Sequence, residues 1–139
     1  MALAHYASRD YLARRGRPRR KRDLLSHDAV TTDESLSQIV YGRIAAERTD
    51  PARRVFRSPS LLAQASAVSA GAGIGALPCF LMDQRPEVER LFRPELEGPL
   101  FLIYPTELRR VARARRVVEL LTELLTDDAP LLEGRAAAR

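Results

Sequence analysis

The sequence predicts a small α/β domain with a mainly parallel sheet. Short apolar, β-prone runs alternate along the chain with segments of helical periodicity, which is the pattern of α/β domains. The 139 residues are 45% hydrophobic and 29% charged, enough for one folded domain of ordinary composition. No internal repeat or heptad array favours a different architecture.

The first half of the chain is expected to alternate strands with short helices. A strand over residues 2–8 precedes a helix over 9–15, in which Tyr11, Leu12 and Arg15 share one face and Gly16 provides the stop. Residues 17–22 form a charged loop and 23–27 one helical turn. A second strand over 29–32, a helix over about 33–48 capped by Asp33 or Ser35, and a third strand over 53–57 complete this half.

The second half holds the best-delimited helix. Ser58 is expected to cap it, Pro59 to occupy its first position and Gly71 to close it. A buried strand over 74–77, a helical turn over 78–82 and strands over 87–92 and 100–104 follow. Thr106 caps a long helix to about residue 125, and residues 127–139 look like a frayed tail. The apolar face of the long helix consists of Leu108, Val111, Val117, Leu121, Leu124 and Leu125.

The net charge of +5 is a local feature. The stretch Arg14–Arg22 (RRGRPRRKR) carries seven of the 23 basic residues, and without it 16 basic residues face 18 acidic ones. The stretch could bind phosphate backbones, but no aromatic residue is interleaved to stack on bases, and Pro18 prevents a continuous basic helix. We favour a solvated loop and keep a small basic nucleic-acid-binding protein as the alternative.

Cysteine usage and hydropathy indicate a cytoplasmic protein. The single cysteine, Cys79, excludes an intrachain disulfide and fits a reducing compartment. The first ten residues lack the pattern of a signal peptide. Residues 58–82 carry no charge, but their glycines, prolines and serines favour a helix, a turn and a strand over a membrane span.

No catalytic, metal or cofactor site can be built from the spacing of reactive residues. His5 and His27 lie far apart without cysteines or carboxylates at metal-ligand spacing, and Cys79 reads as a small buried residue. Gly71–Ala76 formally matches the G-x-G-x-x-A dinucleotide pattern, but here the glycines follow a helix and lead into a strand. We therefore expect no metal, no cofactor and no enzymatic activity.

The segment Ser58, Pro59, Ser60 is the best candidate ligand site. The start of a helix exposes N–H groups and the positive end of the helix dipole, so these residues could bind a carboxylate or another anion. Plain N-capping explains the same residues without any ligand, and the sequence leaves both readings open.

Two stretches resemble the effector-binding domain of the bacterial LysR-type transcriptional regulators. Residues 5–27 (HYASRDYLARRGRPRRKRDLLSH) resemble the strand, "YL…G.P" and "DL..H" pattern that enters the second regulatory lobe. Residues 54–81 (RVFRSPSLLAQASAVSAGAGIGALPCFL) resemble the strand, capped helix and "AG.GI..LP" run. Residues 100–125 match the closing strand and helix more loosely.

The resemblance implies a periplasmic-binding-protein-like lobe with an incomplete first lobe. Residues 1–8 would be a crossing strand, 9–86 the second lobe, 87–125 the second crossing strand, return strand and C-terminal helix of the first lobe, and 126–139 a flexible tail. Nothing in the sequence matches the family's helix-turn-helix, so its DNA contact is not carried over. Ser8, Ser58, Pro59 and Ser60 would line the cleft that binds a small-molecule effector.

The resemblance also implies an uncovered helix face. In the family the last helix covers the sheet of the first lobe, so its apolar stripe here would be exposed and would drive association. We expect a homo-oligomer whose interface includes Leu108, Val111, Val117, Leu121 and Leu124. The sequence thus predicts an effector-sensing and oligomerisation module for transcription regulation, without membrane contact, that binds a small molecule such as an organic anion.

Overall fold

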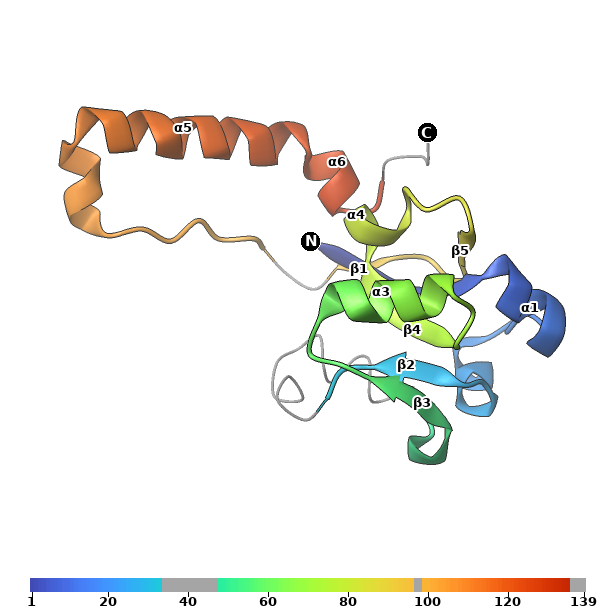
Figure 1. The fold of residues 1–139 in the computed structure, drawn as a ribbon. Coiled ribbons are helices and arrows are strands. Elements are labelled where there is room, and N and C mark those ends of the chain that lie inside the picture. The colour runs from blue at the N-terminus through green and yellow to red at the C-terminus, as the bar shows by residue number, and fades with distance from the viewer. Residues whose placement is uncertain (34–47, 97–98, 136–139) are drawn as a thin grey trace.

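A computed structural model describes residues 1–33, 48–96 and 99–135 of the chain. A six-stranded sheet lies at its centre, with strand order β3-β2-β4-β1-β5 (Figure 1). β5 pairs with the end of β1, and β6 pairs with the start of β1. The strands are β1 (Ala2–Ser8), β2 (Ala29–Thr31), β3 (Arg54–Arg57), β4 (Ile74–Pro78), β5 (Val88–Arg90) and β6 (Glu95–Leu96).

The strands run in one direction with a single exception. β2 pairs in parallel with β3 and β4, whereas β1 pairs antiparallel with β4, β5 and β6. Every described strand except β1 therefore points the same way, which confirms the α/β class and the mainly parallel sheet. The reversed strand lies between β4 on one side and β5 and β6 on the other, and its direction decides which residues meet at each edge of the sheet.

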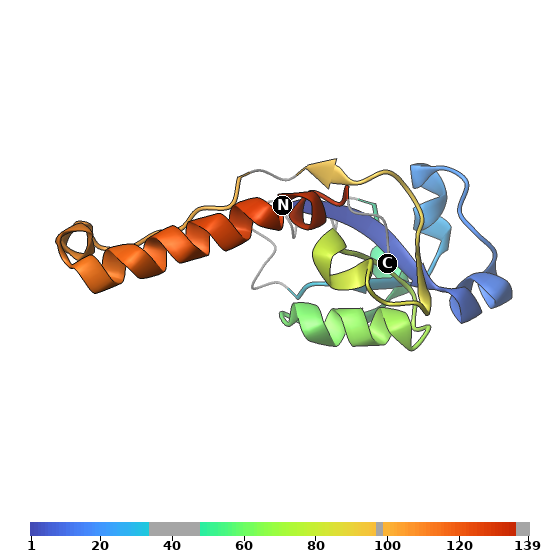
Figure 2. The ribbon, with the colours of Figure 1, turned by 90° about the horizontal axis from the view of Figure 1, so that it is seen from above.

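Helices cover both faces of the sheet. α3 (Leu61–Ser69) packs on β1, β2 and β4, and α4 (Cys79–Met82) packs on β1 and β4. On the opposite face lies the 3₁₀ helix η1 (Lys21–Ser26), and α1 (Arg9–Arg15) continues from the end of β1 (Figure 2). A further 3₁₀ turn, η3 (Pro51–Arg53), precedes β3.

The core consists of two apolar clusters joined by β1. Ala4 and Tyr6 belong to the cluster under α3 and α4, and Ala7 belongs to the cluster with Tyr11 and Leu24. All seven residues of β1 are buried, because the strand has neighbours on both sides and both of its faces are covered. This explains why the run ALAHYAS lacks the alternation of a half-exposed strand.

The expected elements before residue 92 are largely confirmed. The strands expected over residues 2–8, 29–32, 53–57, 74–77 and 87–92 correspond to β1 to β5. α1 ends at Gly16, whose φ of 81° is the positive value that favours glycine. Gly71, with φ of 80°, follows α3 as expected. The helix expected over residues 33–48 falls mostly outside the described residues.

Two helices begin later than the sequence predicted. α3 begins at Leu61 with Ser60 as its cap, so Ser58 and Pro59 precede the helix. The long helix α5 (Ala112–Asp127) begins six residues after Thr106, because the 3₁₀ turn η4 (Thr106–Arg110) occupies the interval. Serines and threonines that could cap a helix are frequent, and local sequence alone does not choose between them.

The strand expected over residues 100–104 is not formed. No described strand pairs with this segment, and Phe101 and Ile103 are 74% and 89% exposed. A strand needs backbone partners on at least one side, so β-prone composition is insufficient here. The short strand β6, which pairs with the start of β1, was not expected from the sequence.

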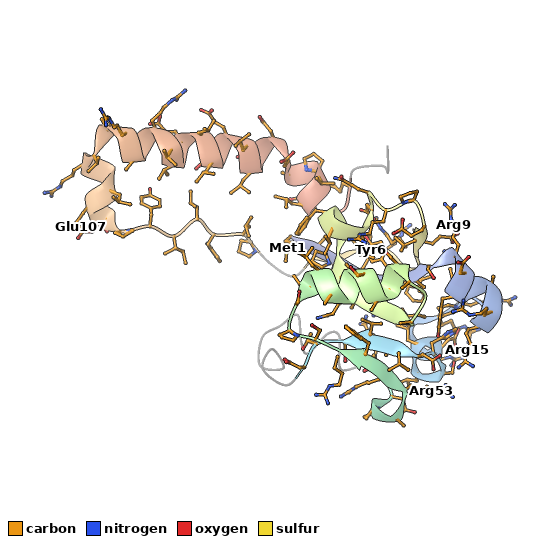
Figure 3. The ribbon with its side chains drawn as sticks, in the orientation of Figure 1. Met1, Tyr6, Arg9, Arg15, Arg53 and Glu107 are labelled. Atoms are coloured by element: carbon orange, nitrogen blue, oxygen red, sulfur yellow. The ribbon has the colours of Figure 1, made fainter. Side chains whose placement is uncertain are left out.

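The C-terminal third forms an arm that leaves the body and returns to it. Residues 99–105 run outward, η4 turns the chain near Glu107, and α5 leads back (Figures 1 and 3). α6 (Ala129–Leu132) then packs against α4, and Arg90 Nη1 donates to the Gly134 carbonyl oxygen at 3.0 Å. The expected tail is therefore helical over part of its length and docked at residue 134, while residues 136–139 lie outside the described range.

Candidate functional site

The carboxyl ends of β2 and β3 lie side by side, and β3 leads into the start of α3. Thr31 pairs with Arg57 in the parallel register, and the Ser58 N–H donates to the Thr31 carbonyl oxygen at 3.1 Å. Ser58, Pro59 and Ser60 then connect β3 to α3. In open sheets of this kind, ligands bind beyond the carboxyl ends of the parallel strands. This edge is therefore the candidate functional site.

Hydrogen bonds hold the connection in one conformation. The Ser58 hydroxyl accepts from the Ser60 N–H at 3.1 Å, and the Ser60 hydroxyl accepts from the Ala63 N–H at 3.3 Å. The Gln64 side chain, which is fully buried, donates from Nε2 to the Ser58 carbonyl oxygen at 2.7 Å. Ser60, rather than Ser58, caps α3, and Ser58 acts one step earlier by fixing the backbone of the connection.

Sequence reasoning missed two polar residues at this edge. Gln64 lies four residues before Val68, and both are fully buried, so its spacing placed it on the core face of α3. The Thr31 hydroxyl is also buried, and within the described part of the chain it has no hydrogen-bond partner. A buried hydroxyl without a partner is costly, so such atoms often mark a site that another group completes.

Ser8 does not join this site, contrary to the sequence prediction. It is 2% exposed and caps α1, where its hydroxyl accepts from the Tyr11 N–H at 3.1 Å. Because β1 runs antiparallel to β4, with Leu3 opposite Pro78 and Tyr6 opposite Gly75, Ser8 lies at the edge where β2 and β4 begin. Ser58 follows the end of β3, so the two serines stand at opposite edges of the sheet.

His27 and Cys79 have structural surroundings. His27 Nδ1 lies 3.1 Å from the Tyr11 hydroxyl, which accepts from the Asp28 N–H at 2.9 Å, and burial lowers the pKa of His27. Cys79 is fully buried, and burial raises the pKa of its thiol, as expected for a core residue. No group of three or more potential metal ligands occurs among residues 1–33, 48–96 and 99–135.

The pattern of the LysR substrate binding domain matches residues 2–126. The chain belongs to this family. Comparison with the curated proteins gives no match. Among solved structures, the regulatory domain of CrgA, a LysR-type transcriptional regulator from Neisseria meningitidis, is similar at 21% identity and a TM-score of 0.65, over 88% of this chain and 64% of that domain.

Two further solved structures support the same fold for this LysR substrate-binding domain. CrgA from Neisseria meningitidis aligns at 23% identity and a TM-score of 0.68, over 89% of this chain and 45% of that one. The regulatory domain of AphB from Vibrio vulnificus treated with cumene hydroperoxide aligns at 19% identity and a TM-score of 0.53, over 81% and 63%. The chain thus spans less than two thirds of the length of these structures.

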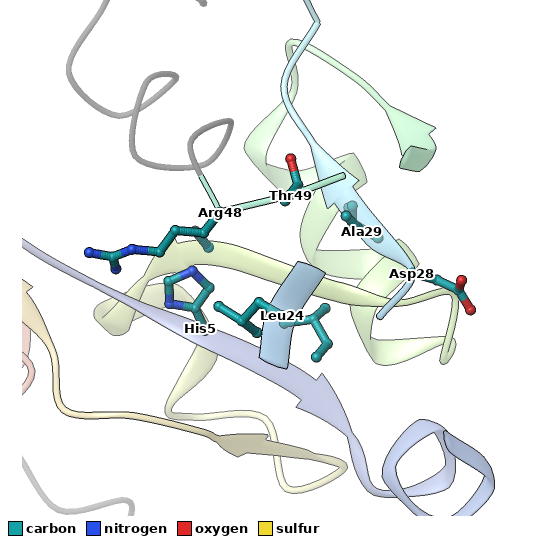
Figure 4. A pocket seen from close by; sticks show the side chains of 9 residues that line it. His5, Leu24, Asp28, Ala29, Arg48 and Thr49 are labelled. Atoms are coloured by element: carbon teal, nitrogen blue, oxygen red, sulfur yellow. The ribbon is translucent and has the colours of Figure 1, made fainter. Parts of the chain in front are cut away.

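A small pocket of this LysR substrate-binding domain lies on the face opposite α3 (Figure 4). His5, Leu24, Arg48 and Thr49 are among its lining residues, and it has room for little more than one water molecule. Burial, followed by the Arg48 charge, lowers the pKa of His5 to about 4, so the ring is neutral at pH 7. The pocket is too small for an organic effector.

Glu95 joins two cations beside that pocket. It accepts from Lys21 and, at 2.6 Å, from Arg48 Nη1. Burial alone would raise the pKa of Glu95, but these hydrogen bonds outweigh it and the pKa is lowered. The two cations thus share one carboxylate, and the cluster ties η1 and residue 48 to β6.

The basic stretch Arg14–Arg22 is largely engaged with acceptors of the same domain. Arg14 donates to the Gly71 carbonyl oxygen at 2.9 Å, Arg15 lies 3.5 Å from an Asp28 oxygen, and Arg17 pairs with Glu89. Lys21 pairs with Glu95, as described above. These contacts leave few of the seven charges for a phosphate backbone, which disfavours the nucleic-acid alternative.

The arm carries the residues that the sequence assigned to an oligomer interface. Leu108, Val111, Val117, Leu121 and Leu124 are 38%, 50%, 56%, 39% and 51% exposed. Leu100 and Leu102 line a pocket together with Thr122 and Leu125, so one side of α5 faces the outgoing segment.

No helix in the described ranges has the length and apolar character needed to cross a bilayer.

Proposed function

We propose that the chain is the effector-sensing and self-associating module of a LysR-type transcriptional regulator, and that it works in the cytoplasm. Its ligand is a small organic anion held at the junction of β3 and α3. The observation that carries this proposal is the position of Ser58, Pro59 and Ser60 at the carboxyl ends of parallel strands and directly before a helix.

The junction suits an anion for electrostatic reasons. The N–H groups of the first turn of α3 have no partner inside the helix, and the helix dipole places partial positive charge there. Pro59 and Ser60 are exposed, so a ligand can approach. The bond from Gln64 to the Ser58 carbonyl preorganises the junction. The Thr31 hydroxyl, which has no hydrogen-bond partner among the described residues, adds a polar group at the end of the adjoining strand β2.

The family membership suggests how the rest of the chain serves the site. We propose that residues 9–86 form the second regulatory lobe, that β1 and residues 87–99 cross between lobes, and that residues 100–125 belong to the first lobe. The exposed apolar side chains of the arm support this assignment, since in the family the last helix covers the sheet of the first lobe with such a face. Effector binding between the lobes would then shift the population of lobe arrangements.

A charge placed at the helix start tests the site. Leu62 is 65% exposed in the first turn of α3, where an acidic residue favours the helix. Leu62→Asp should therefore fold normally while repelling an anion, and Leu62→Asn is the matched neutral control. The probes are benzoate, phenylacetate, succinate and citrate, with binding measured by thermal shift and calorimetry.

We expect at least one probe to raise the melting temperature of the unmodified chain. Leu62→Asp should weaken that binding about tenfold or more, whereas Leu62→Asn should leave it within about threefold. Equal binding by the aspartate variant would place the anion elsewhere, and failure of every probe would remove the organic-anion proposal. Salt-sensitive DNA binding that is lost on changing Arg19 and Arg20 to glutamine would instead favour the alternative.

A further inference from the structure

One side of α5 presents an apolar stripe that the described residues do not cover. The stripe consists of Val117, Leu120, Leu121 and Leu124, which are 39–56% exposed, and no residue of α5 is buried. Their spacing of three and four residues places them in one row along the helix. The row containing Thr122 and Leu125 faces the outgoing segment, so at about 100° per residue the stripe belongs to a different side of α5.

The charges on α5 are separated along its length. Arg113, Arg115 and Arg116 lie in the first third, and Glu119, Glu123 and Asp127 follow, with no acidic residue in the first turn and no basic one in the last. This order opposes the helix dipole, which favours acids at the start and bases at the end. Within a single helix the arrangement is unfavourable, apart from the pair between Arg116 and Glu119 at 3.3 Å.

An antiparallel partner with the same sequence reverses that disadvantage. Each arginine-rich half then lies against the acidic half of the other helix, and the two dipoles oppose each other. A parallel pair would instead bring like charges together. The charge order therefore selects both the identity of the partner, which is a second copy of this chain, and its direction.

We propose that α5 packs antiparallel against α5 of a second copy, with a two-fold axis between Leu120 and Leu121. In this register Val117 meets Leu124 of the second copy, and Leu120 meets Leu121. The flanks pair Arg113 with Asp127 and Arg116 with Glu123 across the axis. This mode specifies the self-association in the proposed function, on which it rests, but it does not require the anion site.

The expected interface is modest. Sixteen residues of α5 correspond to about 24 Å of helix, and the apolar stripe extends over only about two turns of it. Interfaces of this size are weak or transient, so we expect dimerisation at micromolar concentrations. Because the flanking pairs are exposed, the association should weaken as salt increases.

Sedimentation velocity of the full 139-residue chain between about 2 and 500 µM tests the mode. Arg113→Glu and Asp127→Arg each place like charges across the axis, yet each improves the match to the helix dipole, so folding should not suffer. Each should weaken dimerisation about tenfold. The double variant should restore it, and so should an equimolar mixture of the two single variants, which forms a complementary heterodimer.

Leu120→Glu should abolish the dimer, while Ala112→Glu, on the polar side of α5, should not. A monomer at every concentration would overturn the proposal, as would unchanged dimerisation of Leu120→Glu, which would assign the contact to Phe101 and Ile103 instead. Failure of the double variant to recover would exclude the antiparallel register. Anion binding is measured on the same samples, so loss of one property leaves the other testable.

Discussion

Acidification should destabilise the domain through the buried side chain of His5. Burial, then the Arg48 charge, lowers the pKa of His5 from 6.5 to about 4 in the folded protein. The unfolded chain binds this proton near pH 6.5. Between pH 6.5 and 4 the unfolded state therefore holds more protons, so the free energy of unfolding falls as the pH falls through this window.

The magnitude follows from the two pKa values. The interval between 6.5 and about 4 corresponds to a total loss of about 3 kcal/mol at about 1.4 kcal/mol per pKa unit. About 2 kcal/mol of this is lost between pH 7 and pH 5, where most carboxylates remain ionised. A domain with a free energy of unfolding of about 5–15 kcal/mol would show this change clearly.

Urea unfolding followed by circular dichroism at pH 7, 6 and 5 measures the effect. His5→Gln keeps a polar, uncharged side chain, so it should remove most of the pH dependence in this range, whatever its stability at pH 7. His27→Gln is the matched comparison. The pKa of His27 is lowered too, so this substitution removes a contribution to the pH dependence of the same sign from a different site. An identical pH dependence in His5→Gln and the unmodified chain would refute the assignment to His5.

Three substitutions test the packing of the body. Tyr6→Phe removes the hydroxyl that donates to Asp83 at 2.6 Å and should lower the free energy of unfolding by about 2 kcal/mol in urea titrations; a change below about 0.5 kcal/mol would contradict this. Gly73→Ala would place a Cβ 2.5 Å from a backbone carbonyl oxygen and should cost about 2–3 kcal/mol, seen as a lower melting temperature; an unchanged melting temperature would show that the backbone can yield. Gly134→Ala would place a Cβ 2.8 Å from the Cys79 sulfur and should loosen α6, raising the rate of Cys79 modification by a thiol reagent about tenfold; an equal rate would mean that α6 does not shield the thiol.

Local signals predicted elements whose determinants lie within a few residues. The helix after β1 was predicted from the face that Tyr11 shares with Leu12 and from the stop at Gly16, and the structure contains both, with Ser8 as a cap that was not expected. The start of α3 was harder, because Ser58 and Ser60 are both capable caps. The choice depends on the fixed end of β3 and on Gln64, whose partner is visible only in the folded chain.

Strand pairing was the main property that the sequence did not reveal. Residues 100–104 have the composition of a strand, yet they form none among the described residues because no strand lies beside them. The short strand β6 forms at Glu95 because the start of β1 is available to pair with it. β-structure is completed by distant backbone groups, so composition gives only half of the requirement.

The sequence by itself determined the strands β1 to β5 in their order, the helices that follow β1 and β3, and the family to which the chain belongs, because each of these depends on short-range pattern. Only the tertiary structure decided that β1 runs against its neighbours, which separates Ser8 from Ser58 and leaves the candidate site at the carboxyl edge of β2 and β3. It also decided that α5 leaves the body with its apolar stripe exposed. Strand direction and helix docking are fixed by contacts between residues far apart in the chain, and no local pattern encodes them.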